Sequence, residues 1–206
     1  KIENGRVQVS GALGVMEING ILAQMIFEKN NYRHDFYVEE SYVIRWMYPY
    51  LEPHGLIMKI NTDRKALAPA VITADLDFWD WYTRRLMADE KFLRDIVARK
   101  SFSKLRSAIA GLYANRGKTI EAELAFQQAR TLYPLSPEAS FRMAQEVMLP
   151  RRRVRDARNL LTEFSERDPG STKATQFINH LDNLIKLEDR TKALEGKQKQ
   201  GKLDIN

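Results

Sequence analysis

The spacing of apolar residues divides the chain into a short front part and a longer helical part. Before residue 67, apolar residues gather in short runs such as FYV and LIMKI, which have the length and residue types of strands. After it, they recur three and four positions apart, as on one face of an amphipathic helix. We therefore predict an α+β protein, mostly α, with a small α/β unit at residues 1–66.

The strongest helical pattern lies in the segment EAELAFQQARTLYPLSP. Its residues at the offsets of the second helix of a tetratricopeptide repeat are Ala122, Phe126, Ala129 and Pro134. The alanines let two helices approach closely, the phenylalanine fills the space between them, and the proline closes the unit. Because Tyr113 and Gly117 stand at the matching offsets of the first helix and its turn, we predict one repeat over residues 103–136.

A degenerate second copy follows 35 residues further on. Ala157, Leu161 and Pro169 correspond to Ala122, Phe126 and Pro134 of the first copy. Ala129 is replaced by the larger Phe164. The turn glycine is missing, and LPRRR stands in its place, with Pro150 ending the first helix. The spacing agrees with the period of about 34 residues that this repeat class has.

Caps and breakers set the remaining boundaries. Ser136 is a natural N-cap ahead of a proline, and DPGST precedes a further apolar stripe that predicts a capping helix over residues 172–189. We expect connecting helices over residues 67–102 and tetratricopeptide-like repeats with their cap over residues 103–190. A polar tail follows over residues 191–206, and we expect it to be mobile at least beyond Gly196.

The front unit is predicted to contain a helix, a strand, a helix and a strand. Residues 15–29 have a helical pattern, DFYVEE is a strand, and Ser41 caps a helix that Pro49 and Pro53 limit, with Gly55 in the left-handed position past its end. LIMKI is then a second strand, joined to the first by a crossover, so we expect the two strands to be parallel. A third strand could come from GRVQVSG.

The segment TADLDFWDWYTRRLM predicts a helix that Thr73 or Asp75 caps. Its apolar face is formed by Phe78, Trp81, Tyr82 and Leu86. Trp79 and Asp80 are expected to point elsewhere, and an indole beside carboxylates could stack on a sugar. We favour the alternative that these aromatic residues join the front unit to the repeats, since an aromatic stripe at helical spacing is usually core.

Glu39, Glu40 and Ser41 form the candidate ligand site, because they lie at the carboxyl end of the first predicted strand. That edge is where open α/β sheets bind ligands, and Trp79 and Asp80 are candidate neighbours for a sugar or sugar phosphate. The same three residues also suit surface and helix-capping roles, which we favour.

We predict no catalytic, metal or cofactor site. The chain has no cysteine, which excludes disulfides, thiolate ligands and cysteine nucleophiles. His34, His54 and His180 lack metal-ligand spacing, no glycine-rich phosphate loop is present, and Ser41 has no nucleophile elbow around it.

The formal net charge of +6 does not by itself indicate a nucleic-acid protein. The basic excess is densest in RRRVRDAR, and no nucleic-acid-binding motif accompanies it, so we expect no nucleic acid partner. A solvated helix face is the simplest explanation. The alternative is contact with anionic lipid through Arg151, Arg152, Arg153 and Arg155.

Four segments together resemble a known family: MEINGILAQMIFEKN, FYVEESYVIRWMYPYLEPHGLIMKIN, FSKLRSAIAGLYANRG and AELAFQQARTLYPLSPEASFRMA. The chain is similar, over roughly residues 6–170, to the C-terminal soluble region of bacterial multi-pass membrane proteins of unknown function that are related to protein O-mannosyltransferases. The resemblance implies an extracytoplasmic (periplasmic) position beside a membrane glycosyltransferase-like part. It carries no catalytic residue, because the catalytic acid of such enzymes lies in the membrane part. Since the chain begins at Lys1, we expect it to be a piece of a longer protein.

Two functions follow as hypotheses. The first is a non-catalytic interaction module that holds a partner or acceptor protein near Arg106, Tyr113 and Ser140, on the inner faces of the first repeat helices. The alternative is a sugar or sugar-phosphate site at the strand end described above.

Overall fold

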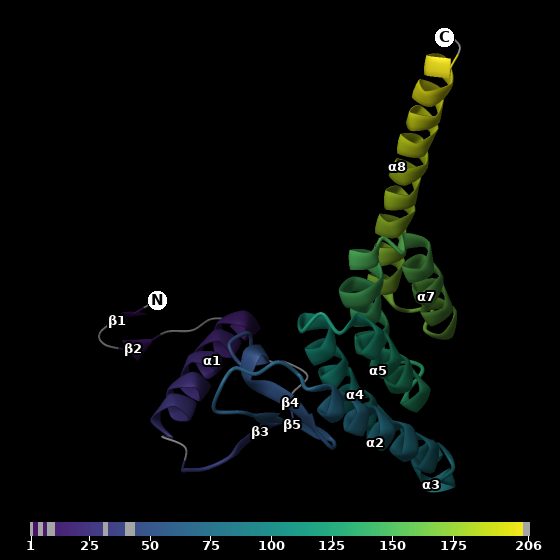
Figure 1. Ribbon diagram of the computed structural model, residues 1–206. Coiled ribbons are helices and arrows are strands. Elements are labelled where there is room, and N and C mark those ends of the chain that lie inside the picture. Colours follow the sequence, from purple (N-terminus) through teal and green to yellow (C-terminus); the bar gives the residue numbers. More distant parts are fainter. Residues whose placement is uncertain (1, 4–5, 8–10, 31–32, 40–43, 204–206) are drawn as a thin grey trace.

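The computed structural model describes residues 2–3, 6–7, 11–30, 33–39 and 44–203 (Figure 1). Side chains are described for residues 11, 14–30, 33–39 and 44–194. The described chain is an α+β protein that is mostly helical and contains a small three-stranded antiparallel sheet. A short hairpin, β1 (Ile2–Glu3) with β2 (Arg6–Val7), precedes helix α1 (Gly11–Lys29). Of the segment GRVQVSG, which was a candidate third strand, Arg6 and Val7 pair in this separate hairpin and Gly11 begins α1, while the rest lies outside the described residues.

The three-stranded sheet has the order β3–β5–β4, formed by β3 (Phe36–Val38), β4 (Leu51–His54) and β5 (Ile57–Ile60). Both pairings are antiparallel, so the predicted parallel pair with its crossover helix is wrong. A two-residue turn that begins at Gly55 (φ 64°) joins β4 to β5. Glycine takes this left-handed conformation without steric cost, as hairpin turns require.

The second predicted helix of the front unit is also wrong where the structure describes it. Residues 45–47 form a turn, a 3-10 helix η1 (Tyr48–Tyr50) follows, and then strand β4 begins. Pro53 lies within β4, an edge strand, where a missing N–H costs little. The two prolines that were expected to limit a helix thus lie in a 3-10 turn and an edge strand.

Helix α1 covers the sheet with one face only. Gly20 is buried, and a Cβ atom there would lie 2.9 Å from the side chain of Ile44. The helix therefore approaches the chain around Ile44 closely. Phe27 packs against Phe36, Trp46 and Tyr50. The large apolar residues of the outer face are exposed: Val15, Met16, Ile21, Leu22, Met25 and Ile26.

Helix α2 (Pro69–Met87) joins the sheet to the helical part. It begins at a proline and not at the expected caps, and Asp75 is buried in its second turn. Trp79 lies on the inner face, fully buried, whereas Trp81 is half exposed, which reverses the predicted orientation of these two rings. The indole N–H of Trp79 donates to the carbonyl of Gly55 at 3.1 Å, and so ties α2 to the hairpin turn.

The helical part continues with the short helix α3 (Glu90–Arg94) and then with seven further helical segments within the described residues. These are α4 (Ile96–Asn115), α5 (Thr119–Leu132), α6 (Pro137–Arg142), a π-helical segment η2 (Met143–Met148), a 3-10 turn η3 (Leu149–Arg151), α7 (Val154–Arg167) and α8 (Thr172–Leu203). The predicted cap is confirmed, because the hydroxyl of Ser136 accepts a hydrogen bond from the N–H of Ala139. The spacer residues expected to pack between helices are buried: Ala122, Phe126, Ala129, Ala157, Leu161 and Phe164.

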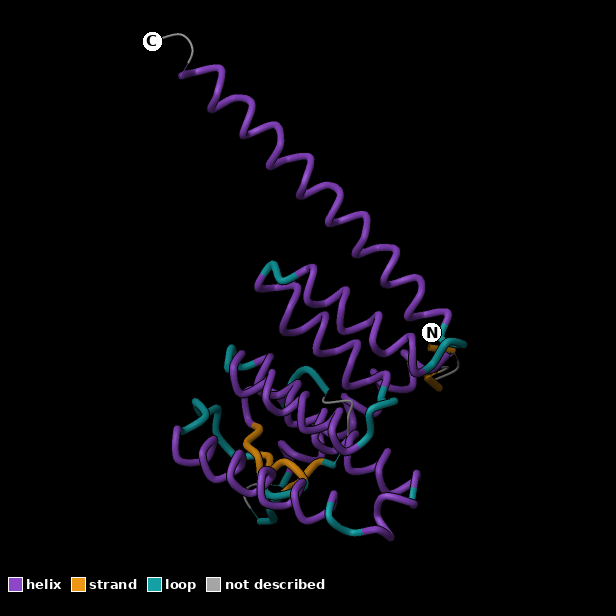
Figure 2. The backbone as a smooth tube through the Cα atoms, turned by 90° about the vertical axis from the view of Figure 1, so that its right-hand side faces the viewer, coloured by secondary structure: helices purple, strands orange, loops and turns teal. Residues whose placement is uncertain are grey.

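Helix α8 runs well past the predicted end of the capping helix. It continues to Leu203 and projects from the rest of the molecule (Figure 2). Its second half is built from good helix formers such as lysine, leucine, glutamate and glutamine, so two glycines do not end it. Residues 191–203 of the predicted polar tail thus continue this helix. Within the described ranges, none of the helices combines the length and apolar character that crossing a bilayer needs.

Candidate functional site

An extended hollow of the helical part lies between α6, η2 and the start of α8. It has a volume of about 990 Å³ and is lined by Pro137, Glu138, Phe141, Arg142, Gln145, Asp168, Ser171, Lys173, Gln176 and Phe177. A second hollow of about 550 Å³ shares Pro137, Glu138 and Asp168 with it and extends to α4 and the end of α7. We call the two together the α6–α8 groove.

The floor of this groove is aromatic. The rings of Phe141 and Phe177 stack with centroids 6.0 Å apart and planes 8° apart, and Phe164 supports Phe141 edge-on from α7. Both groove rings are partly exposed. A partly exposed pair of stacked rings offers an apolar contact surface that is already desolvated on one side, which suits binding of an apolar side chain.

Arg142 forms the side wall of the groove and is held from several directions. Its Nε donates to Glu146 at 2.7 Å, its Nη1 to Glu138 at 3.3 Å, and Nη1 also donates to the carbonyl of Ser107 in α4. Burial alone would lower the pKa of Arg142, but its carboxylate partners outweigh this effect and the pKa is raised. The guanidinium is therefore a fixed cation.

Gly111 makes room for this arginine. A Cβ atom at this position of α4 would overlap the guanidinium of Arg142. The absence of a side chain in the middle of a helix costs about 1 kcal/mol of helix propensity. Here it allows the arginine to lie flat on α4, over the ring of Phe126 at 5.7 Å.

Arg142 also connects the groove to the front unit. Tyr48 of η1 lies beside it, and burial raises the pKa of the tyrosine hydroxyl while the charge of Arg142 opposes that rise. Tyr48 and Glu146 line a third hollow of about 330 Å³ against α4. Burial similarly raises the pKa of Glu138, again opposed by Arg142.

The wall next to Arg142 is an irregular helix. Residues Met143–Met148 are in π-helical geometry, which is rare and occurs frequently at functional sites. This wider helical turn begins at the residue after Arg142. It contains Gln145, which lines the groove. The irregular turn has a buried side, formed by Met143, Ala144, Val147 and Met148, and its exposed residue Gln145 lines the groove.

The predicted partner residues lie in the interior and not on a surface. Arg106, Tyr113 and Ser140 are fully buried, so none of them can contact a partner in this conformation. Arg106 and Tyr113 both donate to one carboxylate oxygen of Asp75, at 2.8 and 2.7 Å. Burial lowers the pKa of Arg106, opposed by Asp75, and burial raises that of Tyr113, helped by the same carboxylate.

The predicted ligand residues are not brought together into a described site. Glu39 is exposed just after β3, and Glu40 and Ser41 lie outside the described residues. Trp79 is fully buried, with Arg106 over its ring at 5.1 Å, so it has no face on which a sugar could stack. Asp80 is exposed and pairs with Arg84 on its own helix at 2.5 Å.

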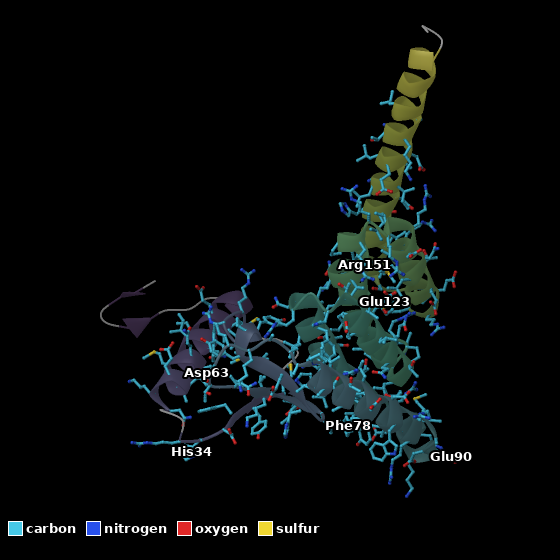
Figure 3. The ribbon with its side chains drawn as sticks, in the orientation of Figure 1. His34, Asp63, Phe78, Glu90, Glu123 and Arg151 are labelled. Carbon is cyan, nitrogen blue, oxygen red and sulfur yellow. The ribbon has the colours of Figure 1, made fainter. Side chains whose placement is uncertain are left out.

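The front unit has a hollow of its own at the opposite end of β3. It measures about 450 Å³ and is lined by Phe27, Glu28, Asn30, His34, Asp35, Tyr50, Lys59, Ile60, Asn61, Thr62 and Lys65. Asp35 and Lys59 pair across it at 3.1 Å. In Figure 3, His34 and Asp63 lie on this unit, far from Glu123 and Arg151 of the helical part. Among the described residues, no three histidine or acidic side chains gather to hold a metal ion.

The basic segment after η3 is largely neutralised by acids. Arg153 donates to Glu123 and Asp156, Arg155 pairs with Asp189, and Arg151 lies 3.9 Å from Glu123. Among the described residues, Arg152 alone of the four has no ion pair. A segment compensated in this way offers little positive charge to anionic lipid.

No protein-family model, no curated protein and no solved structure matches the chain. The functional conclusion therefore rests on the groove itself. Sequence reasoning did not select Phe141, Arg142 or Phe177 as binding residues, although Glu138, Arg142 and Glu146 follow each other at four-residue spacing, which signals a linked charge row on a helix.

Proposed function

We propose that residues 103–190 form a tetratricopeptide-like array and that the chain is a non-catalytic protein-interaction region whose binding surface is the α6–α8 groove. The observation that carries this proposal is a partly exposed aromatic floor beside a fixed arginine, in a hollow of about 990 Å³ between the first helices of successive helix pairs. Such a groove suits a polypeptide segment, which supplies apolar side chains and hydrogen-bonding groups together.

The repeat character is supported by backbone conformation as well as by burial. Gly117 ends the turn after α4 with φ 70°, and Arg152, 35 residues later, ends the corresponding turn after η3 with φ 58°. Each turn leads into a helix of 14 residues, α5 and α7. Two helix pairs with the same turn at the same offset are what a repeat of this class requires.

The resemblance to the membrane protein family extends the proposal to the parent protein. In this view the chain is the soluble arm of a bacterial membrane glycosyltransferase-like protein, lies on the extracytoplasmic side, and holds a partner or acceptor protein for it. The support is the set of four segments quoted above, and the groove gives the arm a surface with which to act.

The test uses a steric block with a matched control. Gln145 is exposed in the groove lining and Gln127 is exposed on α5 outside it, and neither side chain makes a hydrogen bond or ion pair within the described residues. A random peptide library is selected on the full chain, and the recovered peptides are measured against Gln145→Trp and Gln127→Trp. We expect binding to fall at least tenfold, or about 1.4 kcal/mol, in Gln145→Trp alone. Equal binding to both variants would place the binding surface elsewhere.

A further inference from the structure

Charged residues of one sign predominate along the α6–α8 groove. Its lining contains five cationic side chains, namely Lys100, Lys104, Arg142, Arg167 and Lys173, but only two carboxylates, Glu138 and Asp168. The cations come from four helices, so their convergence is a property of the fold and not of one basic segment. The groove therefore has an excess of positive charge at its rim.

Not all of this charge is taken up inside the protein. Arg142 is neutralised by Glu138 and Glu146, and Arg167 pairs with Glu163 at 2.9 Å. Lys100 lies over the ring of Tyr133 at 5.6 Å, which leaves its charge uncompensated. Lys173, in the first turn of α8, is exposed, and no hydrogen bond or ion pair involves its side chain among the described residues. Lys173 lines the larger hollow and Lys100 lines the smaller one.

We propose, resting on the function proposed above, that the groove binds an extended acidic peptide segment in which carboxylates flank a large apolar or aromatic side chain. The apolar side chain packs on Phe141 and Phe177, and the carboxylates lie near Lys100 and Lys173. Opposite charges at a partly enclosed surface raise the association rate and disfavour partners of the wrong sign. Arg142, already saturated by carboxylates, fixes the wall and leaves recognition of the acidic groups to the lysines.

The experiment compares two fluorescent peptide pools of equal length on the full chain. In one pool glutamates flank a central phenylalanine or leucine, and in the other lysines take their place. We expect the acidic pool to bind, to weaken as salt rises, and to be excluded by Gln145→Trp. Lys173→Glu should weaken binding about three- to tenfold, whereas Lys186→Glu, an exposed lysine on the same helix outside the groove, should not change it.

The outcomes separate this inference from the proposed function. If the basic pool binds as well or better and Gln145→Trp still excludes it, the groove is an interaction surface but the acidic specificity is wrong. If the acidic pool binds and Gln145→Trp has no effect, the inference is overturned because the site is elsewhere. If neither pool binds but library-selected peptides do, the acidic-peptide inference fails and the proposed function stands. If no peptide of any kind binds, both proposals fail.

Discussion

Asp75 holds three parts of the molecule together with one carboxylate. It lies in α2, and its Oδ2 accepts hydrogen bonds from Arg106 and Tyr113 of α4, while Arg106 Nε also donates to Gln128 of α5. The side chains of Arg106 and Asp75 are 0% and 2% exposed. A buried ion pair adds little net stability over an apolar replacement, but removing one partner leaves an uncompensated charge in the interior.

Asp75→Asn should therefore lower the free energy of unfolding by about 3–5 kcal/mol, because Arg106 loses its only anionic partner among the described residues. Asp77→Asn is the matched control, since Asp77 lies two positions further along the same helix and is exposed. Denaturant unfolding of both variants measures the difference. If both variants lose a similar, small amount of unfolding free energy, water or another group compensates the charge of Arg106.

At the scale of elements, the helices after residue 102 were predictable from the sequence, and the elements of the front unit were only partly predictable. The period of 35 residues, the small residues at Ala122 and Ala157 and the cap at Ser136 predicted helices that the structure contains. Strand β4 was missed because Pro53 is compatible with both a helix end and an edge strand, and local sequence does not distinguish them.

The candidate site was less predictable than the fold. Arg106 and Tyr113 were expected on a surface because helix periodicity does not say which neighbour covers a face. That neighbour is α2, whose buried Asp75 and Trp79 face them. The groove depends on the approach of Phe141 to Phe177, which lie 36 positions apart on different helices. Such a contact follows from tertiary packing and has no local signal.

The two turns that lead into α5 and α7 give an element-scale prediction. Arg152 adopts the left-handed conformation that costs a residue with a Cβ atom about 1–2 kcal/mol. Arg152→Gly should raise the free energy of unfolding by about 0.5–1 kcal/mol, after the backbone entropy of glycine is subtracted. Arg151→Gly, at a neighbouring position in the 3-10 turn, should lower it by about the same amount. Thermal unfolding of both variants measures the two changes. A lower free energy of unfolding in both variants would show that the backbone at Arg152 is not strained.

At the scale of the whole molecule, the front unit and the helical part are joined by specific contacts. Arg116, which directly follows α4, donates to the carbonyl of Tyr48 at 2.7 Å and to that of Lys65, and Trp79 donates to the carbonyl of Gly55. Because Tyr48 also lies beside Arg142, the front unit supports the same wall that borders the groove. The helical part is therefore supported by the front unit as well as by its own packing, as the proposed array of two repeats would need, since isolated arrays usually require about three.

The central claim is that the α6–α8 groove is the surface through which this protein binds a polypeptide. Backbone amide shifts of the nitrogen-15-labelled full chain, recorded during titration with the acidic peptide pool, test it most directly. We expect the largest shifts at Gln145, Lys173, Gln176 and their neighbours in α4 and α6, with little change on α1 or on the outer side of α5. Shifts concentrated in the front unit, or no shifts at any peptide concentration, would contradict the claim.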